Sequence, residues 1–239
     1  MEYTQDYKSK IMKRNIIGII LLLAVCTLPA YGQIGEQRHN LAIGVNGGIN
    51  LNSVNFSPTV SQKNLMGING GFTARYISEK YFSMICGVQA EINFSQRGWD
   101  EFYEDYPELR YTRKMNYVEI PFLAHIAFGK NRGLQFFIHA GPQIAFLISD
   151  SQTKLSGDWE NFQNINVEQH NKPIDNKFDY GIAGGGGIEI RTKAGNFLVE
   201  GRYYYGLADF YGNTKKDYFS RSANATITAK ITYLFDLKK

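Results

Sequence analysis

The C-terminal stretch from Ala223 to Phe235 alternates between apolar and polar residues. Its odd-numbered positions hold Ala, Ile, Tyr and Phe, and its even-numbered positions hold Asn, Thr and Lys, with Leu234 as the exception. A period of two indicates an extended strand with one apolar and one polar face. Strands of soluble domains usually have about 5–6 residues, so a stretch of this length indicates a strand that crosses a membrane.

Seven further stretches show the same alternation. They are Leu41–Leu51, Ile68–Ile77, Tyr81–Ser95, Met115–Phe128, Leu134–Ile148, Phe178–Arg191 and Phe197–Leu207. Short connections at residues 78–79, 129–133 and 192–195 alternate with long ones at residues 52–67, 96–114, 149–177 and 208–220. This plan predicts an all-β fold, an eight-stranded antiparallel up-and-down transmembrane β-barrel with short periplasmic turns and long external loops.

A lipocalin-like soluble barrel with an apolar lumen is the alternative, because periodicity does not say which face points outward. A soluble barrel needs a well-charged outer face, whereas the polar face here is mostly Asn, Gln, Thr, Ser and Gly. The apolar face is nearly free of charge, as lipid contact requires, since a mid-bilayer Lys or Arg costs about 2–4 kcal/mol. Aromatic residues also gather at both strand ends, as in interfacial girdles. They are Tyr76, Phe128, Phe136, Phe197, Tyr233 and Phe235 near the short turns, and Phe94, Phe146, Tyr203 and Tyr205 near the loops. The membrane barrel is therefore the preferred prediction.

The N-terminus has the layout of a secretory signal peptide. Lys13 and Arg14 precede an apolar run at residues 16–28, and Ala30 and Gly32 supply the small residues that signal peptidase requires. We expect cleavage after Gly32, which leaves residues 1–32 as an extension and signal peptide and residues 33–239 as one barrel domain.

Two details of this end stay open. Translation starts at Met1 or at Met12, which directly precedes the basic pair. A lipoprotein site at Cys26 is disfavoured because Val25 stands where a small residue is needed. After cleavage Cys86 would be the remaining cysteine, which excludes an internal disulfide. The net charge of +4 falls further once the basic leader is removed, so no nucleic-acid partner is predicted.

Several short motifs occur in order along the predicted strands. They are Tyr117–Pro121, Tyr180–Gly181 with Gly184–Glu189, Arg202–Leu207 and the Tyr233–Phe235 ending. With these motifs the chain resembles the PorT-like outer-membrane β-barrels common in Bacteroidetes. The resemblance covers nearly the whole mature chain and implies an integral outer-membrane protein of a Gram-negative bacterium. For the family's founder it also implies an accessory role in protein secretion. The tail Asp236–Lys239 extends past the usual terminal aromatic residue.

The predicted inward face carries many charged residues and two histidines. They are Arg75, Glu91, Glu119, His125, His139, Asp179, Glu189, Arg191, Glu200, Arg202 and Lys230. Side chains fill the interior of an eight-stranded barrel, so we expect an ion-paired lumen network. Pairing across the turn at residues 193–194 sets Arg202 opposite Gly185 and Glu200 opposite Gly187, where glycine leaves room for long side chains.

The two histidines have an ordinary interpretation and a chemical one. Pairing about Asn131 would make His125 and His139 diagonal neighbours, opposite Phe137 and Leu123 and without a Ser or carboxylate beside them. Hydrogen bonds to lumen groups such as Gln135 are the expected role. A metal site or catalytic base is the alternative, but no catalytic residue, metal or cofactor is assigned.

The long loops carry large aromatic residues. Trp99, Tyr103 and Tyr106 lie in an acidic aromatic cluster, and Trp159 lies in the longest loop. Such residues are common anchors for a partner protein, or they fold back onto the barrel mouth or rest in lipopolysaccharide. The expected function is a non-enzymatic, monomeric barrel in outer-membrane lipid that acts as an anchor or as an accessory partner in assembly or protein secretion. Its partner would be an envelope protein. A small-solute channel and a lipid-modifying barrel enzyme are the alternatives.

Overall fold

The computed structural model describes residues 35–106, 109–130, 132–155 and 167–238, and its strands pair in antiparallel fashion. The predicted signal peptide and Trp159 lie outside the described residues. The strands are β1 (Glu36–Ser57), β2 (Gln62–Lys63), β3 (Leu65–Tyr81), β4 (Met84–Phe102), β5 (Arg110–Gly129), β6 (Gly133–Leu155), β7 (Phe178–Arg191), β8 (Asn196–Gly206) and β9 (Arg221–Lys238). No helix in the described part of the chain is long and apolar enough to cross a membrane.

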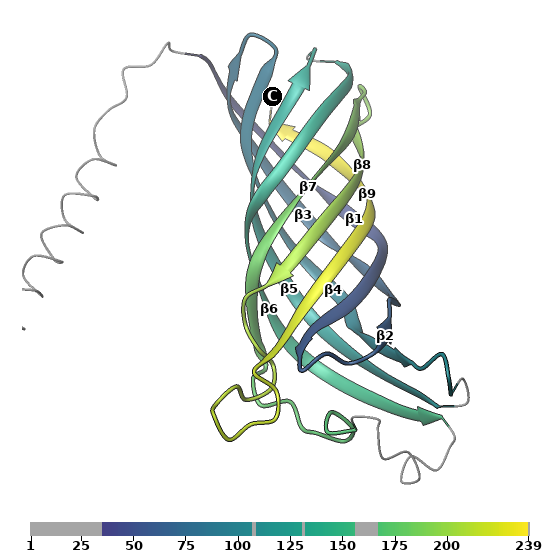
Figure 1. The fold of residues 1–239 in the computed structure, drawn as a ribbon. Coiled ribbons are helices and arrows are strands. Elements are labelled where there is room, and N and C mark those ends of the chain that lie inside the picture. Colours follow the sequence, from purple (N-terminus) through teal and green to yellow (C-terminus); the bar gives the residue numbers. More distant parts are fainter. Residues whose placement is uncertain (1–34, 107–108, 131, 156–166, 239) are drawn as a thin grey trace, which may run out of the picture. The chain divides into compact units, whose positions relative to one another are not determined.

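The long strands close into a ring. Their order is β4, β3, β1, β9, β8, β7, β6 and β5, and β5 pairs again with β4 (Figure 1). The first and last strands pair from Leu41 opposite Lys238 to Ser57 opposite Arg221. Strand β2 is an addition outside this ring and pairs with β4 near the loop end. The predicted eight-stranded up-and-down barrel is confirmed.

Alternation along each strand separates an apolar outer wall from a polar interior. Phe72 on β3 is 71% exposed, whereas Arg75, three residues further along the same strand, is 2% exposed. On β9, Ile227 and Ile231 are exposed while Lys230 is buried. Such a barrel buries its charges and exposes its aliphatic side chains, as required when the surrounding solvent is lipid.

Strands β4, β5 and β6 extend further at the loop end than the predicted ends at Ser95, Met115 and Ile148. The structure continues them to Phe102, Arg110 and Leu155, and they project beyond the other strands (Figure 1). In this part the pattern is inverted, because Tyr111 and Met115 are buried inside while Arg110 and Lys114 are exposed. This inversion is expected where a strand extends beyond the lipid into water. Because of it, the sequence pattern predicted a loop where the structure has a strand.

The interior of the barrel is layered. An apolar layer near the short turns comprises Ala42, Ile77, Ile85, Ala127, Phe137, Leu198 and Leu234. A larger apolar cluster near the loops includes Phe56, Trp99, Leu109, Tyr111, Met115, Tyr117, Phe210, Tyr211 and Phe219. Most of the buried charges lie on strand positions between these two layers.

Candidate functional site

The centre of the lumen holds two carboxylates and two cations in mutual contact. Glu91 on β4 accepts both terminal nitrogens of Arg202, at 2.9 and 3.0 Å, and the Lys230 ammonium at 2.7 Å. Glu200 lies 2.6 Å from Arg202 and 3.2 Å from Lys230. Each cation therefore contacts both acids, and the four residues come from β4, β8 and β9. Such a closed network compensates the desolvation of buried charges.

Two further ion-paired groups lie along the lumen on either side of this centre, one toward the short turns and one toward the loops. Arg75 on β3 binds Glu189 on β7 through two hydrogen bonds of 2.6 and 2.8 Å, which bridge the lumen. Arg97 contacts Glu119 and Asp179, each at 2.7 Å. Arg97 was missed in the sequence because it falls in the stretch predicted as a loop, although its odd position continues the inward face of β4.

The predicted register of β7 and β8 agrees with the structure. Arg202 lies opposite Gly185, and Glu200 lies opposite Gly187. A Cβ atom added at Gly185 would lie 2.2 Å from the carbonyl oxygen of Gly201 on β8. Glycine thus permits the close approach of the two backbones beside the charged network.

The predicted arrangement of the two histidines is wrong. His125 lies directly opposite His139, with 2.7 Å between Nδ1 of the first and Nε2 of the second. The turn is centred one residue later than predicted, and a shift of one in the centre moves each partner by two residues. A carboxylate is also present, because His139 Nδ1 lies 3.2 Å from Glu200. Gln135 instead donates to the Lys130 carbonyl at 2.5 Å.

The histidine pair is buried and belongs to the lumen network through Glu200. Among the described residues, no group of three or more His, Cys, Asp or Glu side chains is placed to hold a metal ion. Arg191, the last of the predicted lumen residues, lies near the short turns. Its Nε is 3.3 Å from Asn196 Oδ1 and 3.5 Å from Glu189 Oε1.

At the loop end, Trp99 is fully buried rather than exposed. Its ring packs edge-on against Phe56 at 5.1 Å and stacks on Phe210 at 5.8 Å between centroids. Its indole N–H donates to Glu101 Oε1 at 3.0 Å. Trp99 therefore folds back onto the barrel mouth, which was the expected alternative to an exposed partner-binding side chain. Its assignment as a partner-binding residue is corrected, because the side chain is fully buried among Phe56, Tyr111 and Phe210.

The other aromatic loop residues are placed differently. Tyr103 is half-buried and donates to Glu101 Oε2 at 3.3 Å. Burial and the neighbouring Glu101 carboxylate raise the pKa of Tyr103 well above its ordinary value. Tyr106 is 38% exposed, so it remains available on the surface.

Two buried charges that sequence reasoning missed hold residues 167–172 across the mouth. Glu101 accepts Gln169 at 3.0 Å and lies 2.8 Å from His170 Nε2. Arg113 donates to the Lys172 carbonyl at 2.6 Å and to the Tyr211 hydroxyl at 2.9 Å. Burial raises the pKa of Tyr211 well above its ordinary value, which keeps the hydroxyl neutral. The period of two at residues 111, 113 and 115 is the signal that could have placed Arg113 on an inward face.

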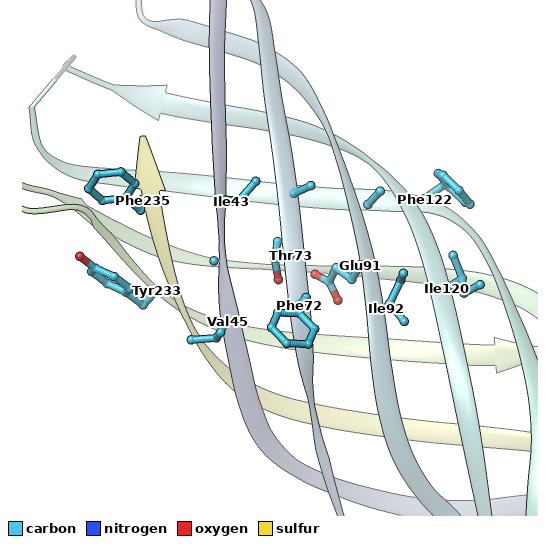
Figure 2. Close-up of a pocket in the computed structure, with 13 residues that line it drawn as sticks. Ile43, Val45, Phe72, Thr73, Glu91, Ile92, Ile120, Phe122, Tyr233 and Phe235 are labelled. Carbon is cyan, nitrogen blue, oxygen red and sulfur yellow. The ribbon is translucent and has the colours of Figure 1, made fainter. Parts of the chain in front are cut away.

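The outer wall carries an apolar groove of about 700 Å³ across β9, β1, β3, β4 and β5 (Figure 2). Ala74 lies opposite Ala90, and these small side chains leave a depression among larger ones such as Phe72, Ile92 and Phe122. Thr73 and Glu91 in its lining are buried in the barrel wall, and the Tyr233 hydroxyl donates to the Ala194 carbonyl. The exposed lining is otherwise apolar, so the groove offers contact with hydrocarbon rather than acid, base or nucleophilic chemistry.

Comparison with solved structures finds other outer-membrane proteins at low identity. Ail of Yersinia pestis is 13% identical, with a TM-score of 0.36 over 85% of this chain and 100% of that one. Neisserial surface protein A is 12% identical, with a TM-score of 0.40 over 81% and 99%. OprG of Pseudomonas aeruginosa is 11% identical, with a TM-score of 0.44 over 85% and 99%. No curated protein matches the chain.

The family model for the outer membrane protein beta-barrel domain matches residues 31–212, which is most of the chain. The match agrees with the closed ring of strands, the lipid-facing apolar wall and the charged interior. The chain belongs to the outer membrane protein beta-barrel domain family and is an integral protein of the outer membrane of a Gram-negative bacterium.

Proposed function

We propose that this barrel is a non-enzymatic outer-membrane anchor or accessory protein, and that its external end binds an envelope protein during assembly or secretion. The resemblance of its motifs to the PorT-like barrels of Bacteroidetes supports the secretion branch of this proposal. Support from the structure comes from the part of the barrel that projects beyond the membrane.

The observation that carries the proposal is an open strand edge at the loop end of β6. Pairing between β6 and β7 reaches Phe146 opposite Phe178, whereas pairing between β6 and β5 continues to Leu155 opposite Arg110. Beyond Phe146, no described residue forms a second ladder with β6. Residues 148–153 are all exposed.

The opposite border of the same projection is covered, because β2 pairs there with β4. An exposed strand edge presents unpaired N–H and C=O groups that can accept a strand from another protein. The stretch without a second ladder to a described strand reads Ser149, Asp150, Ser151, Gln152 and Thr153, and one contact from the mouth reaches it, from the Asn171 backbone N–H to Gln152 Oε1 at 2.9 Å. Polar residues of this kind keep such an edge soluble until a specific partner binds.

The filled lumen favours an anchor over a channel. The buried ion pairs lie between an apolar layer at the turn end and an apolar cluster at the loop end. A conducting pathway would have to break several buried charge contacts. The lipid-modifying alternative receives little support, because the paired histidines lie inside the lumen rather than on the wall that meets lipid.

Site-specific photo-crosslinking in cells tests the proposal. A photoreactive residue at Thr153 on the open edge should give a discrete adduct with one envelope protein. The same residue at Lys193, in the short turn between β7 and β8, is the matched control and should not give that adduct. Absence of an adduct from Ser149, Ser151 and Thr153 alike, or the same adduct from both ends of the barrel, would contradict the proposal.

A further inference from the structure

A small cavity opens at the short-turn end of the lumen, away from the external loops. Its volume is about 270 Å³, and its lining includes Arg38, Arg132, Arg191, Asn196 and Asp236. These residues come from β1, from the turn before β6, and from β7, β8 and β9. The apolar layer, with Leu198 and Leu234 fully buried, lies next along β8 and β9. A ligand would therefore enter this cavity from the periplasmic side.

The lining holds three guanidinium groups and one carboxylate, so it carries excess positive charge. The carboxylate of Asp236 already accepts the Asn196 side-chain amide at 2.7 Å. An arginine presents five N–H donors and no acceptor. The cavity is accordingly rich in donors and poor in acceptors.

The individual arginines are incompletely paired. Arg38 contacts the exposed Glu36 at 3.1 Å through Nη2, while its buried Nε has no hydrogen-bond partner among the described residues. Arg191 reaches Glu189 at 3.5 Å, but that acid already accepts two shorter hydrogen bonds from Arg75. The side chains of Arg38 and Arg191 are only 12% and 9% exposed.

Arg132 completes the group from the turn between β5 and β6. Its side chain is exposed and lines the cavity. The three guanidinium groups outnumber the one carboxylate in the cavity lining, and an excess of partly buried positive charge is costly unless an anion compensates it. Guanidinium forks fit the oxygen atoms of phosphate groups through paired, charge-assisted hydrogen bonds.

We propose that this cavity is a binding site for a phosphate group at the periplasmic mouth of the barrel. The phosphate is either free in the periplasm or part of a phospholipid headgroup of the inner leaflet. The arginines would bind its oxygens, and Asn196 would keep the Asp236 carboxylate turned to one side. This site is independent of the open β6 edge, which lies at the other end of the barrel.

The test uses the purified mature barrel in detergent micelles and in nanodiscs. Titration calorimetry with inorganic phosphate measures binding of the free anion, and acetate serves as a carboxylate probe. Native mass spectrometry after extraction from phosphatidylcholine nanodiscs containing phosphatidylglycerol measures retention of the anionic lipid. Saturable binding in the first arm identifies free phosphate, and selective retention in the second identifies a headgroup.

The substitution Arg132→Gln should weaken either kind of binding about tenfold, which corresponds to about 1.4 kcal/mol, because it removes one charge-assisted hydrogen bond. Lys130→Gln removes the same charge from the same turn, yet Lys130 does not line the cavity, so it should change binding less than twofold. Retained heat-modifiable mobility on gels shows that both variants fold. The proposal is overturned if the barrel neither binds phosphate saturably nor retains the anionic lipid. It is also overturned if acetate binds as tightly as phosphate, or if the two substitutions weaken binding equally.

Discussion

Glu91 is the acid on which the central lumen network depends, so Glu91→Gln is the sharpest test of that network. One carboxylate oxygen accepts Gln89 at 2.7 Å and Arg202 at 2.9 Å. The other accepts Asn93 at 2.8 Å, Arg202 at 3.0 Å and Lys230 at 2.7 Å. A glutamine amide replaces one acceptor oxygen with a donor that faces other donors, and it removes the negative charge.

The expected cost follows from burial. Both cations would share the single acid Glu200, and removing one partner of a buried ion pair destabilises by about 3–5 kcal/mol. Each 1.4 kcal/mol is a factor of ten, so the folding equilibrium should shift by at least about a hundredfold. Glu36→Gln is the matched control, because the Glu36 carboxylate that pairs with Arg38 is 64% exposed, and a pair with a solvent-exposed carboxylate contributes about 0–1 kcal/mol.

Reversible unfolding in guanidinium chloride, with the barrel refolded into lipid vesicles, measures both variants. Adding Lys230→Met to Glu91→Gln should recover part of the loss, because the second change removes a cation that has lost its partner. Coupling between contacting residues is typically about 0.5–3 kcal/mol. The reasoning is refuted if Glu91→Gln lies within 1 kcal/mol of wild type or if the two changes are additive.

Three further outcomes concern the wall and the mouth. Ile227→Lys places a charge in lipid at a cost of about 2–4 kcal/mol and should block insertion, whereas Thr228→Ala on the inner face should insert normally. Equal insertion of the two variants into vesicles would show that the faces are misassigned. Gly185→Ala should prevent a stable fold, because the added Cβ would lie 2.2 Å from a backbone oxygen, whereas a Cβ at Gly201 has nothing within 4 Å, so Gly201→Ala should fold. Heat-modifiable mobility on gels distinguishes the folded variant from the unfolded one. Trp99→Ala should destabilise the barrel by about 3–5 kcal/mol through the cavity it leaves, and unchanged denaturant midpoints would contradict the buried position.

Hydrophobic alternation was sufficient to predict the barrel because lipid on one side and a packed lumen on the other enforce a period of two. The Phe178–Arg191 strand has the same bounds in the structure. Prediction failed where that contrast reverses. In the Arg110–Lys114 stretch Tyr111 and Arg113 are buried while Arg110 and Lys114 are exposed, so the outer face is charged and the strand was assigned to a loop.

The lumen residues could be placed on the inner face, but their partners depended on register. The four-residue turn at Thr192–Gly195 is short enough to make the β7–β8 pairing predictable. The connection before β6, at residues 130–132, is flanked by glycines with positive φ at Gly129 and Gly133, and the sequence did not show where in residues 129–133 the strands end, so the centre of the turn was predicted one residue too early. This one-residue error in the turn centre is the reason that the direct pairing of His125 with His139 was not predicted. Contacts across the lumen, such as Arg75 with Glu189, join strands that are not neighbours, and no local pattern predicts them.

The Arg75–Glu189 bridge has a consequence for how the barrel is assembled. Its partners lie 114 residues apart on β3 and β7, and they meet only when the sheet has curled into a ring. An incompletely closed sheet in lipid would leave both charges without compensation in a medium of low dielectric constant. The bridge therefore stabilises the closed ring relative to a sheet that still lacks strands. This difference makes the closure of the barrel cooperative.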